Sequence, residues 1–231
     1  MCSRGIERTD SCDICRWNRV GAENKQLKCV MKCDIMILEK REEKTMDNKL
    51  FMELQNRFSP IISNLINLNG KFYHFRKTIR WQFSYNEQVA VIAWCDSKTN
   101  FLTVNVCSVE FAFQIGQPLM IEYFLLHEIR HLFQFNEISD YETNPDLCVD
   151  KNLAKKWSEE NKKYVGALKE NGEVNQSYYN QDMEFDAFAF SFAVMKYKYG
   201  EIPYIERPKA YGKKFDDIVE KWCEAFQSEG L

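Results

Sequence analysis

The sequence lacks any apolar run of the roughly 18 residues that a membrane-spanning helix needs, and its start, MCSRGIERTD, lacks the apolar core of a secretory signal. It has no internal repeats and no low-complexity tract. It also lacks a strong excess of either charge, because the net charge is only -3 and the pI is about 5.8. We therefore expect a cytoplasmic protein with no global attraction for nucleic acid or for an anionic membrane.

The composition is that of a globular protein with one main domain, since 45% of the 231 residues are hydrophobic and 14% are aromatic. The nine cysteines are odd in number, and nothing in the sequence indicates export, so we expect reduced thiols rather than disulfides. The four cysteines after Met46 have no spacing typical of a metal site: Cys95, Cys107, Cys148 and Cys223.

The first 45 residues allow two interpretations. A CxxC pair and a CxxxC pair, separated by 13 residues, could form a four-thiolate zinc knuckle from Cys12, Cys15, Cys29 and Cys33. Alternatively, KREEKTMDNKL (residues 40–50) can be back-translated to contain GGAGG, a bacterial ribosome-binding sequence, just before Met46. The segment has no helical or strand periodicity. We favour a non-native or disordered extension over residues 1–45, a start at Met46 and a single domain over residues 46–231.

The hydrophobic periodicity after Met46 predicts an α+β fold. An amphipathic helix over residues 47–67, which Pro60 could kink, precedes three mostly antiparallel strands, which fall in residues 71–85, 88–96 and 101–109. Pro118 is suited to the first turn of a largely buried helix over residues 119–135. Three more helices follow: a charged one through Lys155 and Lys169, an apolar one over residues 183–200 that Gly200 ends, and an amphipathic one around residues 215–226.

The buried helix contains HEIRH, residues 127–131, with two of the chain's three histidines. Residues four apart lie above one another on a helix, so His127 and His131 can bind one metal ion. Glu128 projects about 100° away and can hold a water molecule without binding the metal. The pattern is rare enough by chance to favour a metal over packed histidines. Arg130 points away from the metal and could pair with an acidic neighbour.

A catalytic zinc usually has three protein ligands, so a third must come from elsewhere. His74, the remaining histidine, falls on a predicted strand without a pattern that selects it. Glu184 starts a very apolar helix, where a buried carboxylate needs a cation or donors. Asp182 and Asp186 are close rivals, and all three acids could instead favour the positive end of the helix.

HEIRH and the later helix together resemble the gluzincin type of zinc metallopeptidase, in particular the ImmA/IrrE family. That family has a downstream helix of the approximate form ExxANxFA, and aligning Ala187 with its first alanine implies Glu184 as the third zinc ligand. Phe188 and Ser191 depart from the family asparagine and last alanine. The resemblance implies a zincin-like minimal metallopeptidase fold, in which a small sheet precedes the HExxH helix. It says little about residues 137–176, which we regard as an insert.

The resulting hypothesis is hydrolysis of a peptide bond, with Zn2+ as cofactor and Glu128 as general base. An oxyanion donor is expected, and Tyr178, Tyr179 and Tyr141 are the candidates. The resemblance implies a protein or peptide substrate inside a bacterial cell, often a DNA-binding repressor, and a role in mobile elements or stress responses. Two other classes stay open: a non-catalytic binding or inhibitor module stabilised by zinc, and a nucleic-acid binder that uses the zinc knuckle.

Overall fold

The computed structural model describes most of the chain after Met46, namely residues 48–73, 78–86, 91–96, 99, 101–167, 175–205, 207–209 and 211–231. The predicted extension over residues 1–45, its zinc knuckle and His74 lie outside the described residues. The described part is α+β and mostly helical, with one small sheet.

The first described helix, α2 (Asn48–Leu68), agrees with the predicted helix and continues through Pro60. Its periodic apolar residues are buried, and Phe58 stacks on Phe113 at a centroid distance of 5.4 Å. A short helix, α3 (Gly70–Tyr73), follows directly. The predicted strand from Lys71 was therefore wrong over its first three residues, because Asn69 accepts a hydrogen bond from Phe72 N–H and thereby extends the helical turn.

The sheet has the order β1-β3-β2, formed by β1 (Arg80–Ser84), β2 (Ala93–Asp96) and β3 (Phe101–Asn105). β2 pairs with β3 in antiparallel fashion, but β1 and β3 are parallel. The prediction of a mostly antiparallel sheet was thus wrong for the β1–β3 pair. The reason is strand order: β3 enters the middle of the sheet, where Leu102 and Val104 are fully buried, and leaves β2 at the edge.

The third strand ends earlier than predicted, because Asn105 starts helix α4 (Val106–Gln114). The Asn105 side chain accepts a hydrogen bond from Cys107 N–H at 3.2 Å and donates to the carbonyl of Val91 at 3.1 Å. An asparagine in this position caps a helix N-terminus. The apolar run after it, VCSVEFAF, belongs to the helix and not to the strand.

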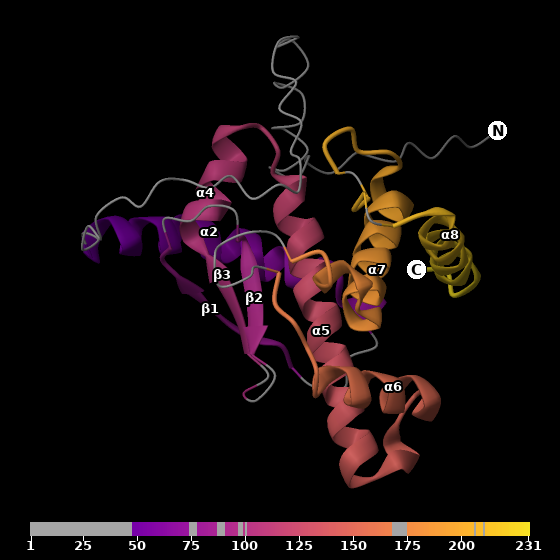
Figure 1. Cartoon of the computed structure of the whole chain (residues 1–231). Helices are drawn as coiled ribbons and strands as arrows, with labels where there is room; N and C mark the ends of the chain where they lie inside the picture. Colours follow the sequence, from indigo (N-terminus) through magenta and orange to yellow (C-terminus); the bar gives the residue numbers. More distant parts are fainter. Residues whose placement is uncertain are drawn as a thin grey trace, which may run out of the picture.

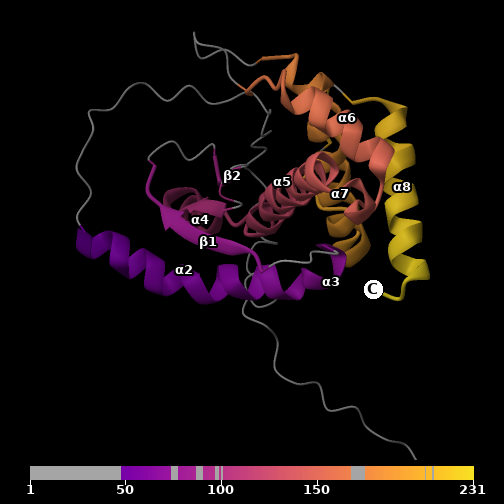
Figure 2. The same ribbon diagram turned by 90° about the horizontal axis from the view of Figure 1, so that it is seen from below.

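The remaining elements lie around α5 (Leu119–Thr143), which is longer than the predicted helix over residues 119–135. The 3-10 helix η2 (Pro145–Leu147), α6 (Lys151–Asn161), the 3-10 helix η3 (Tyr178–Asn180), α7 (Asp182–Tyr199) and α8 (Lys213–Ser228) follow. Figures 1 and 2 show α5 in the middle, with the sheet on one side of it and α7 and α8 on the other. Among the described residues, no helix combines the length and apolar character needed to cross a membrane.

Candidate metal centre

The two histidines of HEIRH lie on the face of α5 that packs against α7. Their Nε2 atoms face each other at 3.1 Å, and the residues are only 2% (His127) and 5% (His131) exposed. The Phe188 ring, from α7, lies 4.2 Å from the His127 ring. The four-residue spacing therefore brings both imidazoles to one buried point, as the sequence predicted.

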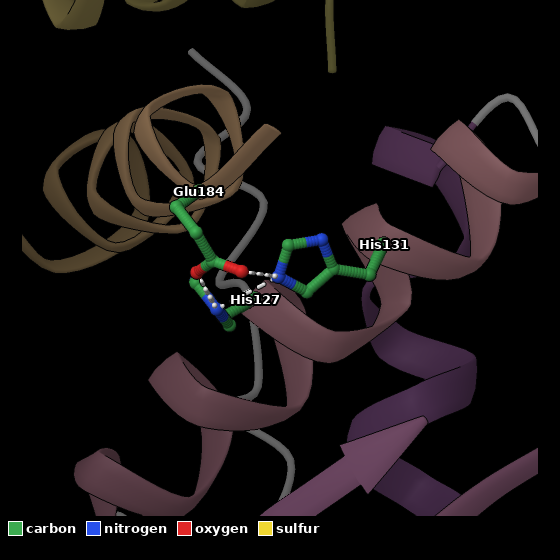
Figure 3. A group of neighbouring side chains, drawn as sticks. All are labelled: His127, His131 and Glu184. Atoms are coloured by element: carbon green, nitrogen blue, oxygen red, sulfur yellow. Dashed lines mark hydrogen bonds and ion pairs between the residues drawn. The ribbon is translucent and has the colours of Figure 1, made fainter. Parts of the chain in front are cut away.

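Glu184, in the first turn of α7, reaches the same point from the other side (Figure 3). Its Oε2 lies 3.4 Å from His127 Nε2, and its Oε1 lies 3.2 Å from His131 Nε2. The residue is fully buried. Within the described part of the chain, these three residues offer ligand atoms that all lie within 4.8 Å of one another. We call His127, His131 and Glu184 the ligand cluster.

The rival acids at the start of α7 have other partners. Asp182 pairs with Lys156 at 2.7 Å on the surface, and Asp186 pairs with Arg130 at 2.7 Å. The helix N-terminus does not depend on these acids, because the Glu160 carboxylate accepts hydrogen bonds from the N–H groups of Asp182 and Met183, both at 2.7 Å. Of the three acids, the structure brings only Glu184 to the histidines.

Burial and the charges within the ligand cluster have opposite effects on the pKa values of Glu184 and His131. Burial favours the neutral form of Glu184, but the neighbouring histidines outweigh it and hold the pKa of this carboxyl well below its usual range. Burial likewise opposes charge on His131, and the Glu184 carboxylate overcomes it and raises the His131 pKa to about 9. A proton on His131 and a cation would therefore compete for the same lone pairs.

Two observations test whether the cluster fits a cation. Glu184 Oε2 is a buried atom for which the described residues provide no hydrogen-bond partner. Ligand atoms about 2.0–2.1 Å from a tetrahedral zinc lie about 3.3–3.4 Å from one another. The two Nε2 atoms, 3.1 Å apart, are close to that separation, and each lies within 3.4 Å of one of the two Glu184 carboxylate oxygens. Nitrogen and oxygen donors in this number and spacing fit a divalent metal ion.

A further layer of contacts orients His131. Its Nδ1 lies 2.8 Å from Gln134 Oε1, so a proton on Nδ1 leaves the Nε2 lone pair directed at the centre of the cluster. The Gln134 amide in turn donates to Met183 O and to Asp186 Oδ2, both at 2.9 Å. Gln134 therefore joins the histidine helix to the helix that carries Glu184.

Arg130 also links the helices around the cluster. Its guanidinium donates to both oxygens of Asp186, at 2.7 and 3.2 Å, which confirms the expectation that it pairs with an acid. The guanidinium carbon lies 4.5–5.7 Å from the centroids of four aromatic rings, from Phe133, Trp157, Phe190 and Trp222. These contacts join α5 to α6, α7 and α8.

Glu128 lies between the ligand cluster and the edge strand β2. Its Oε2 accepts a hydrogen bond from the backbone N–H of Cys95, at 3.0 Å. Burial raises the pKa of the Glu128 carboxyl, and the charges of His127 and His131 counteract this in part. Glu128 is thus an electrostatic neighbour of the ligand cluster and is not itself a member of it.

Two of the three tyrosines named from the sequence lie near the ligand cluster, and the third does not. Tyr178 and Tyr179 lie near the cluster, with their rings 6.4 and 6.2 Å from that of Phe188. Tyr141 is ten residues beyond His131 on the same helix, about 15 Å along its axis at roughly 1.5 Å per residue. The structure therefore does not bring Tyr141 to the ligand cluster.

Sequence reasoning missed three residues of the site. Tyr164 donates a 2.6 Å hydrogen bond from its hydroxyl to Glu184 Oε1, although it lies in the insert. No local pattern singles out Tyr164 or Cys95, whereas Gln134 could have been found, because it follows His131 by three residues on one helix face.

The cysteines add no further ligand. Cys95 and Cys223 are free thiols, as predicted for them. None of the four described cysteines, Cys95, Cys107, Cys148 and Cys223, belongs to the ligand cluster.

Comparison of the chain with family models, with curated proteins and with solved structures found no match. The function is therefore inferred from the geometry of the site and from the sequence motif.

Proposed function

We propose that the protein is a zinc-dependent peptidase in which His127, His131 and Glu184 hold the ion. The observation that carries this proposal is the convergence of three buried ligands from two helices, with Glu128 beside them and no fourth ligand in the described part of the chain. Structural zinc sites are closed by four protein ligands, whereas catalytic sites keep one position open. The zincin-like fold and the ImmA/IrrE resemblance belong to the same proposal.

Each residue has a distinct role in the proposed reaction. When bound, the ion lowers the pKa of a coordinated water and polarises the scissile carbonyl. Glu128 takes a proton from the attacking water and returns it to the leaving amine. The backbone N–H of Cys95 keeps the Glu128 carboxylate at the side of the cluster that β2 covers. Gln134 keeps the His131 ring in its ligand orientation.

The substrate class rests on the resemblance alone. HEIRH and the Glu184 helix imply a protein or peptide substrate, and a DNA-binding repressor is the leading candidate. The cytoplasmic compartment and the bacterial or mobile-element origin have the same basis.

The test compares zinc content and cleavage in matched variants of the full chain. We expect wild type to retain about one zinc at this site and to cleave a pool of quenched fluorescent peptides. Glu128→Gln should retain that zinc and lose activity by roughly 10²–10⁴-fold. Glu110→Gln, the same substitution on α4, is the control and should keep both. His131→Ala should lose about one zinc relative to wild type.

The test must distinguish zinc bound by the N-terminal cysteines from zinc bound by the ligand cluster. A variant with serine at Cys12, Cys15, Cys29 and Cys33 should keep the zinc that is absent from His131→Ala. If wild type and His131→Ala hold equal amounts of zinc, the ligand assignment fails. If wild type holds zinc but Glu128→Gln cleaves as well as wild type, the general-base role fails. Zinc without any cleavage would favour the non-catalytic binding or inhibitor module.

A further inference from the structure

The segment after α6 brings a phenol to the ligand cluster. The Tyr164 hydroxyl donates to Glu184 Oε1 at 2.6 Å, and this oxygen also lies 3.2 Å from His131 Nε2. Tyr164 as a whole is 43% exposed, so its hydroxyl reaches a buried group while much of its ring faces solvent. It therefore lies where a ligand coming from solvent would meet the cluster.

A pair of backbone contacts fixes this segment to the Glu184 helix. Gln181, which precedes the first turn of α7 and is 7% exposed, donates from its side-chain amide to Tyr178 O at 3.3 Å and makes two further hydrogen bonds to Val165. Its Oε1 accepts from Val165 N–H at 2.8 Å, and its Nε2 donates to the Val165 carbonyl at 2.9 Å. The residue next to Tyr164 is thus attached to the helix turn that carries Glu184. We call these two hydrogen bonds the Gln181 clamp.

The surroundings keep the Tyr164 hydroxyl a hydrogen-bond donor. Its hydroxyl lies 2.6 Å from Glu184 Oε1, and an ionised carboxylate only accepts hydrogen bonds, so the phenol is the donor in this contact. Tyr178 also lies near the cluster, but its ring packs against Tyr179 and Phe188. Tyr164 has the more exposed ring, and Tyr178 is its rival.

We propose that Tyr164 is the donor that stabilises the negative charge developing on the substrate carbonyl oxygen, and that the Gln181 clamp positions it. This inference rests on the proposed peptidase function. A donor already aimed at the site needs little reorganisation when the charge develops, and this makes such groups effective in catalysis. The clamp gives the insert a function, because the insert supplies a residue that the two motif helices lack.

The experiment uses the cobalt(II)-substituted full chain and acetohydroxamate, whose two oxygens imitate the attacking and carbonyl oxygens. Binding is followed by the visible spectrum of the cobalt, so the readout does not require activity. Tyr164→Phe should weaken acetohydroxamate binding by roughly 10- to 100-fold, the worth of a hydrogen bond to a charged group. Zinc affinity, measured against a chromophoric chelator, should stay within about threefold of wild type, since His127, His131 and Glu184 remain.

Two tyrosine variants complete the comparison. Tyr197→Phe is the matched control, because the Tyr197 hydroxyl also donates a 2.6 Å hydrogen bond, to Leu231 O away from the cluster. It should bind acetohydroxamate as wild type does. Tyr178→Phe should also leave this binding within about threefold, and a larger loss in Tyr178→Phe than in Tyr164→Phe would assign the role to Tyr178 and overturn the proposal.

The positioning role of Gln181 is tested by non-additivity. Gln181→Leu should weaken acetohydroxamate binding, and adding Tyr164→Phe should cause little further loss, because both changes remove one interaction. Losses that multiply would overturn the positioning role. Circular dichroism and the thermal midpoint confirm that each variant is folded.

Other outcomes separate this inference from the proposed function. If Tyr164→Phe lowers zinc affinity by roughly 10- to 100-fold and leaves acetohydroxamate binding to the saturated protein unchanged, Tyr164 only orients Glu184, and the donor role is overturned while the metal site stands. If wild type binds neither cobalt nor zinc at His131, the peptidase proposal fails and this inference fails with it.

Discussion

Two carboxylates are buried at the interface between α5 and α7, and they differ in the groups that surround their negative charge. Glu122 is 1% exposed and is surrounded by donors of the protein: Lys198 and Asn69 donate to its Oε1, and Tyr199 donates to its Oε2 at 2.8 Å. Glu184 is also fully buried, but it faces two imidazoles, and its Oε2 lacks a hydrogen-bond partner among the described residues.

The comparison shows that burial of a carboxylate does not by itself indicate a metal. A lysine from the same pair of helices completes the Glu122 cluster, formed by Asn69, Glu122, Lys198 and Tyr199, so that cluster needs nothing from solution. The ligand cluster has no lysine or arginine of its own, and its three members offer nitrogen and oxygen atoms that could hold a metal ion.

The largest effect is expected from disrupting the Glu122 cluster. Lys198→Met should lower the free energy of unfolding by about 3–5 kcal/mol, because it leaves Glu122 buried without its cation. Urea denaturation measures this loss, and it should be equal with zinc and with a chelator. The double variant Glu122→Gln with Lys198→Met should recover much of the stability. A loss that depends on zinc would mean that the two clusters are not independent.

Zinc should stabilise the protein through the other cluster. At 100 times the dissociation constant, the gain in unfolding free energy should be about 2.7 kcal/mol. Urea denaturation with buffered zinc and with a chelator measures it. His131→Ala should abolish the gain, whereas Lys198→Met should retain it in full. An equal gain in His131→Ala and wild type would place the responsible zinc elsewhere.

A smaller effect is expected from the residue that orients His131. Gln134→Leu removes the acceptor for the imidazole Nδ1 proton and should weaken zinc binding by roughly 10- to 100-fold. Competition with a chromophoric chelator measures the affinity. Gln114→Leu, at the end of α4, is the control and should bind zinc as wild type does. Unchanged affinity in Gln134→Leu would show that helix packing alone orients the ring.

The smallest effect is expected for Asp182, which belongs to neither the ligand cluster nor the Glu122 cluster. Asp182 forms a surface pair with Lys156, and both side chains are well exposed, at 40% and 56%. Asp182→Asn should therefore change the unfolding free energy by less than about 1 kcal/mol and leave zinc content unchanged. Thermal unfolding and metal analysis measure both. Loss of zinc in Asp182→Asn would reopen the choice of the third ligand.

The sequence was sufficient to predict the parts of the site that depend on helix periodicity. The spacing of His127 and His131 follows from 3.6 residues per turn, and the apolar residues of the later helix made an acid at its start a candidate ligand. The choice of Glu184 among the three acids came from the family resemblance. Asp182 and Asp186 looked equivalent in sequence, and only the contacts with Lys156 and Arg130 separate them. Those partners come from other elements, which a local pattern does not identify.

The fold was predicted less completely, for identifiable reasons. The run after Asn105 is short and apolar, and such a run suits a strand or a buried helix equally well. The parallel pairing of β1 with β3 depends on strand order, which the alternation within each strand does not encode. Tyr164 was missed because its contact with Glu184 depends on the Gln181 clamp, a contact between residues 16 positions apart. The metallopeptidase fold stays a prediction.

The position of the ligands along the chain has a topological consequence. His131 and Glu184 are 53 positions apart, and the whole of α6 lies between them. An ion bound to both would close this stretch of chain into a loop in the folded protein, and the ends of the loop could separate only after the ion is released. The junction of α5 and α7, the two helices that carry the ligands, should therefore be the part of the fold whose opening depends most on zinc.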